Sequence, residues 1–172
     1  MKKTTKMLAT SLIVAVGLAA CGSNSSSTST NAANRLTMTT FGELTTLDSA
    51  DYDDVPSSDM MGQIFEGLYR VAANNKVELG MAAQEPKVSE DGLVYTFTLR
   101  DAKWSDGSAV KAQDFVFTYR KLVNPQEGHV AQSADVFKNA KKIRSGELPV
   151  EELGVKALDD KTLEITLENP AP

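Results

Sequence analysis

Few side chains in this chain are suited to catalysis, because its 172 residues include one histidine and one cysteine. The histidine, His129, lies in the polar run Glu127-Gly128-His129-Val130. A serine hydrolase needs a nucleophile beside such a base, and no serine occupies the Gly-x-Ser-x-Gly turn that exposes one. We therefore interpret His129 as a loop residue and expect no catalytic residue and no enzymatic activity.

The sequence also gives no indication of a metal or cofactor site. Asp51, Asp53 and Asp54 form an acidic cluster that lacks the glycine and the distal glutamate of a calcium-binding loop. The remaining glycines occur in neither a Gly-x-Gly-x-x-Gly nor a Walker pattern. We expect no metal and no cofactor, and we interpret the acidic cluster as a solvated loop.

Cys21 ends an apolar run, residues 7–20, that follows three lysines. A basic start, a short apolar stretch and small residues before the cleavage point are typical of an export signal, and the stretch is too short to favour a membrane span. The ending Leu18-Ala19-Ala20-Cys21 resembles a bacterial lipobox. This implies a signal peptide over residues 1–20 and lipid modification of Cys21; a buried free thiol in an N-terminal helix is the less favoured alternative.

Residues 21–34, CGSNSSSTSTNAAN, have almost nothing to bury and are interpreted as a flexible tether. The remaining 35–172 are long enough for one domain with a hydrophobic core. The chain has 18 basic and 23 acidic residues and a formal charge of −5, which becomes −8 without the three lysines of residues 1–20. This charge argues against nucleic acid as a partner.

Alternation of apolar and polar residues predicts strands over 36–41, 93–100 and 161–168. Turns are expected at Glu90-Asp91-Gly92 and at Trp104-Ser105-Asp106-Gly107. Trp104 is interpreted as a core residue in preference to a ligand-stacking one.

Helical spacing of apolar residues predicts three helices. One starts at a Ser57 or Ser58 cap and buries Met61, Ile64, Phe65 and Leu68, after a loop over 48–56 that Pro56 closes. The second covers 112–123, with Asp114 in its first turn, and the third covers 133–144, with Val136, Phe137, Ala140 and Ile143 inward. These elements indicate an α/β or α+β domain, and its abrupt end at 169–172 suggests a fragment.

Four runs together resemble the peptide-binding proteins of ABC importers, which are extracytoplasmic solute-binding proteins of family 5. The runs are FEGL (65–68), YTFTLRDAKWSDG (95–107), DFVFTYR (114–120) and GVKALDDKTLEITL (154–167). The resemblance covers 35–172 and implies an α/β fold of the type II periplasmic-binding-protein-like class. Only part of the first lobe and the small extra domain would be present, as the N-terminal part of a truncated solute-binding domain.

The same resemblance implies ligand-binding residues at Asp53, Asp54 and Val55, where relatives hold a peptide backbone in strand-like pairing. It also implies an oligopeptide ligand, ABC permease subunits as partners and a lipid anchor on the extracytoplasmic face of the cell membrane. Two departures stand out: Ser49 replaces a proline, and Lys111 replaces a threonine that could cap the following helix. The alternatives are another cargo on the same fold (a signalling peptide, haem or a nickel complex) and, less favoured, an exported hydrolase or adhesin.

Overall fold

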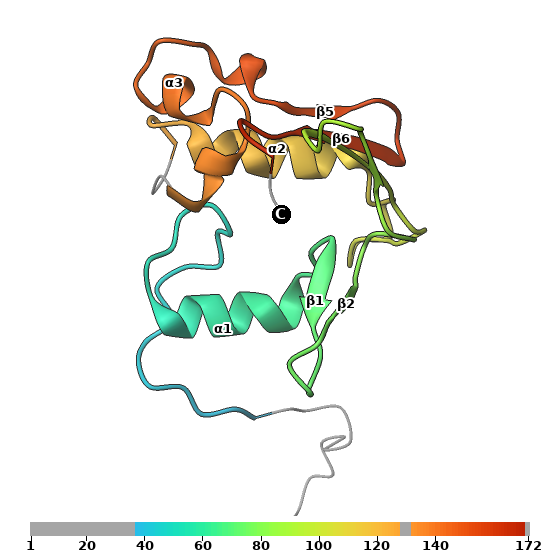
Figure 1. The fold of residues 1–172 in the computed structure, drawn as a ribbon. Helices are drawn as coiled ribbons and strands as arrows, with labels where there is room; N and C mark the ends of the chain where they lie inside the picture. The colour runs from blue at the N-terminus through green and yellow to red at the C-terminus, as the bar shows by residue number, and fades with distance from the viewer. Residues whose placement is uncertain (1–36, 128–131, 171–172) are drawn as a thin grey trace, which may run out of the picture. The chain divides into compact units, whose positions relative to one another are not determined.

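The main sheet is built from the two most regularly alternating segments of the sequence. In the computed structural model, which describes residues 37–127 and 132–170, β4 (Val94–Thr98) pairs antiparallel with β6 (Thr162–Thr166). Short strands β3 (Lys87–Val88) and β5 (Val155–Ala157) complete the order β3-β4-β6-β5, and Figure 1 shows β5 and β6 side by side. Both long strands confirm the sequence prediction. The signal-peptide and tether assignments, Cys21 and His129 lie outside the described residues.

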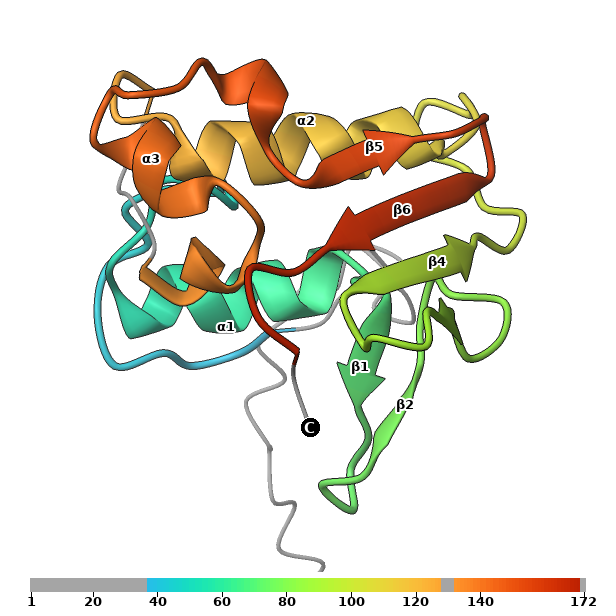
Figure 2. The ribbon, with the colours of Figure 1, turned by 45° about the horizontal axis from the view of Figure 1, so that its top comes forward.

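Helix α2 (Ala112–Val123) packs against β5 and β6, as Figure 2 shows. Ala112, Val116 and Val123 are buried in the core, which confirms the predicted helix and its inward face. Its start is held by Asp114, whose carboxylate accepts a hydrogen bond from the Lys111 backbone N–H at 2.9 Å. Helix α2 therefore keeps a cap although Lys111 has no hydroxyl to offer.

Trp104 belongs to the same cap and not to the core. Its indole Nε1 donates to Asp114 at 3.0 Å, and 41% of the residue is exposed. The predicted turn is present, with Gly107 N–H donating to the Trp104 carbonyl at 2.9 Å and Gly107 at φ +90°. The core interpretation of Trp104 was wrong because the turn places the indole over the helix start.

The single helix predicted over 133–144 is instead a 3-10 turn, η2 (Gln132–Val136), and a short helix, α3 (Ala140–Arg144). Between them Lys138 N–H donates to the Thr166 carbonyl at 2.9 Å, so this segment pairs with the end of β6 and leaves the helix. Asn139 takes the left-handed φ of 68° at the break. Ala140 and Ile143 are buried as predicted, whereas Val136 is exposed. A second 3-10 turn, η3 (Val150–Glu152), leads into β5.

Helix α1 (Val55–Ile64) leads into the hairpin of β1 (Tyr69–Val71) and β2 (Val77–Leu79). The helix ends before the predicted Leu68, because Gly67 and Leu68 carbonyls accept bonds from Met81, Gly80 and Ala82 N–H groups. Met61 and Leu68 are buried as expected, but Ile64 and Phe65 are about half exposed, against the prediction.

The strand predicted over 36–41 is not observed in its described part. Residues 37–40 are exposed and have no regular secondary structure. Alternation identifies a chain that could lie in a sheet, but a strand forms only where a neighbouring strand accepts its hydrogen bonds. Among residues 37–127 and 132–170, no helix is long and apolar enough to cross a bilayer.

Candidate ligand-binding site

The three residues that the sequence singles out for ligand binding meet at the start of α1. Asp54 is the N-cap, and Val55 and Pro56 are the first two helical residues. Proline is tolerated there because the first helical N–H groups have no partner within the helix. The prediction that Ser57 or Ser58 caps the helix, with Pro56 still in the loop, was therefore wrong by one helical turn.

Both carboxylate oxygens of Asp54 already accept hydrogen bonds from the protein. Oδ1 accepts from the Ser57 backbone N–H at 2.8 Å, and Oδ2 accepts from the Thr45 hydroxyl. These bonds, the Thr45 contact first, hold the pKa of Asp54 below its ordinary value. Asp54 is accordingly ionised and oriented by its own chain.

Ser57 lies beneath this cap with no exposed surface. Its hydroxyl oxygen accepts from the Thr46 backbone N–H at 3.3 Å and lies 3.2 Å from the Thr45 hydroxyl oxygen. Because a buried hydroxyl without partners is costly, these contacts specify the position of Ser57 against the 45–46 segment. The start of α1 is thus joined to the chain that precedes the loop.

The other end of the loop is held by Asp48. Its Oδ2 contacts the Lys121 ammonium on α2, and its Oδ1 accepts from the Ala50 backbone N–H at 3.0 Å. The Lys121 hydrogen bond, followed by the Ala50 bond, lowers the pKa of Asp48. Residues 49–53 therefore lie between a fixed point on α2 and a fixed point on α1.

The three predicted binding residues differ in how much of each side chain is available to a ligand. Asp53 is exposed and Val55 is 64% exposed, whereas the carboxylate of Asp54 is already bonded within the protein. The structure brings the three together as neighbours but does not test contact with a ligand. Their binding role stays a prediction.

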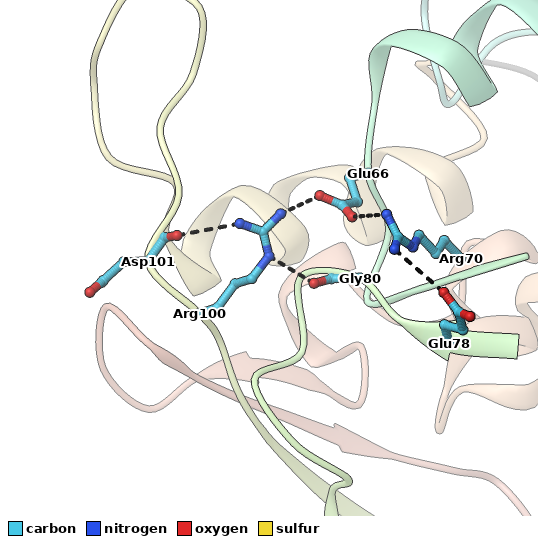
Figure 3. Close-up of polar contacts among 6 residues, drawn as sticks. All are labelled: Glu66, Arg70, Glu78, Gly80, Arg100 and Asp101. Atoms are coloured by element: carbon cyan, nitrogen blue, oxygen red, sulfur yellow. Dashed lines mark hydrogen bonds and ion pairs between the residues drawn. The ribbon is translucent and has the colours of Figure 1, made fainter. Parts of the chain in front are cut away.

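A separate open pocket of about 400 Å³ lies beside the end of α1. Glu66 joins two arginines there, with Arg70 Nη1 at 3.7 Å and Arg100 in direct contact (Figure 3). Arg70 also reaches Glu78 at 3.4 Å, and Arg100 Nε donates to the Gly80 carbonyl at 2.8 Å. The cluster holds two positive and two negative charges and connects the chain after α1 to the chain after β4.

Metal ligation has no support in the part of the chain that the structure describes. No group of three or more histidine, cysteine, aspartate or glutamate side chains gathers there. Asp51 and Asp53 lie on the loop without forming such a group with Asp54.

The sequence did not identify three residues that support the loop, Thr45, Asp48 and Lys121, and it gave Ser57 the capping role that Asp54 has. Aspartate is a preferred N-cap residue, and its carboxylate accepts from the backbone N–H two or three residues later. The capping role of Asp54 could therefore have been predicted from the sequence. Asp48 and Lys121 are 73 positions apart, so no local pattern links them.

Residues 76–172 match the model described as bacterial extracellular solute-binding proteins, family 5 Middle. This match covers more than half of the chain, which therefore belongs to the family of bacterial extracellular solute-binding proteins. Members of this family are binding proteins and not enzymes.

Individual relatives agree with the family match. The periplasmic oligopeptide-binding protein OppA of Escherichia coli is 38% identical over 141 residues, which are 76% of this chain and 24% of that protein. The chain thus spans about a quarter of the length of such curated relatives.

Solved structures resemble the described fold. The substrate-binding domain of an oligopeptide ABC transporter from Bacillus anthracis is 45% identical, with a TM-score of 0.72 over 76% of this chain and 25% of that one. Listeria monocytogenes OppA bound to peptide is 42% identical, with a TM-score of 0.68 over 72% of this chain and 25% of that one. The type II periplasmic-binding-protein-like fold predicted from the sequence is confirmed.

Replacing Asp54 with alanine removes the cap acceptor and should lower the melting temperature of the protein by a few degrees at pH 7. Asp54→Asn keeps a capping oxygen and should retain most of the stability. Because the folded pKa of Asp54 is lowered, its contribution is present above the unfolded value of 3.8 and is lost as the pH falls through the folded pKa. Thermal unfolding between pH 7 and pH 2 measures both effects.

Asp53→Ala is the matched control, since Asp53 is an exposed neighbour that caps nothing. It should leave the melting temperature and its pH dependence unchanged. Equal losses for Asp53→Ala and Asp54→Ala would contradict the capping role.

Proposed function

We propose that the protein is a substrate-binding receptor that captures oligopeptides outside the cell and delivers them to an ABC permease. The observation that carries this proposal is family membership together with 38% identity to an oligopeptide-binding protein and 45% identity to the substrate-binding domain of an oligopeptide transporter. The chain covers about a quarter of each relative, so the activity belongs to the full-length protein. Cargo binding and release then require no covalent chemistry.

The start of α1 supports recognition of the peptide backbone by the main chain. Both oxygens of the Asp54 carboxylate accept bonds from Ser57 and Thr45, and the Asp54 carbonyl accepts from the Ser58 N–H at 3.2 Å, so we expect a peptide to bind the remaining main-chain groups of 53–55. Main-chain hydrogen bonds suit any peptide sequence, since every residue carries the same donor and acceptor. This arrangement fits a receptor with broad sequence tolerance.

The charged ends of a peptide need partners elsewhere in the full-length protein. An ammonium group binds best to a carboxylate that has free lone pairs and little competition from other donors. Asp54 is already engaged, so it is a poor partner for that group. Asp53 is exposed and contributes to the electrostatic environment of the loop.

The lipid anchor is the second part of the proposal. In this proposal Cys21, which follows Leu18-Ala19-Ala20 and is the first residue of the 21–34 tether, is acylated and holds the protein on the extracytoplasmic face of the cell membrane. Stable attachment needs more than one acyl chain, at about 0.8 kcal/mol per buried methylene. A receptor held beside its permease gains effective concentration for cargo transfer.

Calorimetric titration of the full-length protein with a mixed pool of short peptides should give binding heat, with dissociation constants on the order of micromolar. The matched control is the same composition supplied as free amino acids, which lack a peptide backbone and should give no heat. Absence of binding heat with every peptide pool would contradict the peptide-receptor proposal.

The same samples separate a receptor from a hydrolase. After incubation, mass spectrometry should recover the peptides uncleaved. Cleavage of many peptide molecules per protein molecule, at a rate that increases with protein concentration, would favour the enzyme alternative.

Metabolic labelling with a palmitate analogue should mark the wild-type protein and not Cys21→Ala, because the thiol is the attachment point. Cys21→Ala should also lose the lipid-anchored form: the variant should appear in the medium or remain as a precursor whose signal peptide is not cleaved. Equal labelling of the two proteins would remove the anchor from the account.

A further inference from the structure

The contact between Asp48 and Lys121 joins the candidate binding loop to a helix that is distant in sequence. Lys121 lies in the last turns of α2, and its ammonium group contacts the Asp48 carboxylate. The side chains are 23% and 38% exposed, so the pair is more sheltered than the ion pairs around Arg70, whose side chain is 59% exposed. Because solvent screens a partly buried ion pair less than an exposed one, the attraction between Asp48 and Lys121 is stronger than in a fully exposed pair.

Lys121 is a firm point of attachment because α2 is anchored in the core. Val116 and Val123 have almost no exposed surface, and the helix packs on β5 and β6. The hydrogen bond that Lys121 donates to the Asp48 carboxylate raises the pKa of Lys121, and the nearby charges of Asp51 and Glu127 act in the same direction. The ammonium group is therefore held in its charged form beside the loop.

Asp48, which Lys121 holds beside α2, also forms hydrogen bonds with the loop backbone. Its Oδ1 accepts from the Ala50 N–H at 3.0 Å, its carbonyl accepts from the Asp51 N–H at 3.1 Å, and its own N–H donates to the Thr46 hydroxyl at 3.0 Å. Ala50, which lies in this turn, is only 3% exposed. The side chain and backbone of one residue thus bond to positions 46, 50 and 51.

We infer that Lys121, acting through Asp48, is a positioning residue that holds the 51–55 segment in its peptide-binding geometry before the ligand arrives. The segment runs from the turn held by the Asp48 contact with α2 to the start of α1, which Asp54 caps. A loop that is ordered in advance loses less conformational entropy on binding, so the pair raises affinity without touching the peptide. This inference rests on the proposed function.

The test compares peptide binding by the full-length protein and four variants. Lys121→Met removes the charge but keeps a long stem, Asp48→Asn removes the opposite charge, and the double variant removes both. Lys121→Arg keeps a cation that can reach the carboxylate. The matched control is Lys111→Met, which breaks an ion pair to Asp160 of 2.8 Å at the other end of α2, away from the loop.

Lys121→Met and Asp48→Asn should each weaken peptide binding by about tenfold, and the double variant should be no weaker than either, because both act on one contact. Lys121→Arg should bind within about twofold of wild type, and Lys111→Met should bind as wild type does. Hydrogen exchange should become faster in 49–53 and remain unchanged in β4 and β6, which separates loosening of the loop from global loss of stability.

Unchanged affinity in both single variants overturns the inference, and so does an additive loss in the double variant. Faster exchange throughout the chain also overturns it, since it indicates a general stabilising role. Failure of the proposed function is recognised separately: the wild-type protein itself then binds no peptide, and the positioning role falls with it.

Discussion

The antiparallel pairing of β4 with β6 is the constraint on which the rest of the described structure depends. It brings residues 94–98 and 162–166 together in register and buries Phe97, Leu163 and Ile165 on the core side. Helix α2 packs against this sheet, and its Lys121 reaches the loop before α1. Arg100, two residues beyond β4, contacts Glu66 beyond the end of α1. The two ends of α1 are thus attached to points whose positions the β4–β6 pair determines.

Apolar and polar contacts have different roles in this arrangement. Burial of Val116, Val123, Leu163 and their neighbours stabilises the body, because burial of a large apolar side chain contributes roughly 1.5–3 kcal/mol. The links to α1 and its loop are hydrogen bonds and partly exposed ion pairs, which contribute little net stability but are directional. The loop over 49–53 is held at both ends in this way, and Tyr52 and Asp53 within it remain exposed.

The sequence predicted best those elements whose packing against the core produces a regular pattern of apolar residues within the element. Residues 93–100 and 161–168 alternate because each has one face in the core, and the apolar spacing of 112–123 reflects packing on the sheet. The prediction failed where a distant contact decided the outcome: Lys138 bonds to Thr166 and interrupts the helix predicted over 133–144. For the site, resemblance indicated 53–55, but the link from Asp48 to Lys121 has no local signature. The capping role of Asp54 was readable from its spacing to Ser57 and was assigned to the wrong residue.

A crystal structure of the full-length protein with a bound peptide tests the central claim most directly. The account predicts hydrogen bonds between the peptide backbone and main-chain groups of 53–55, with the Asp54 carboxylate still bonded to Ser57 and Thr45 and Asp48 still in contact with Lys121. A peptide bound elsewhere, with 53–55 left facing solvent, would contradict it.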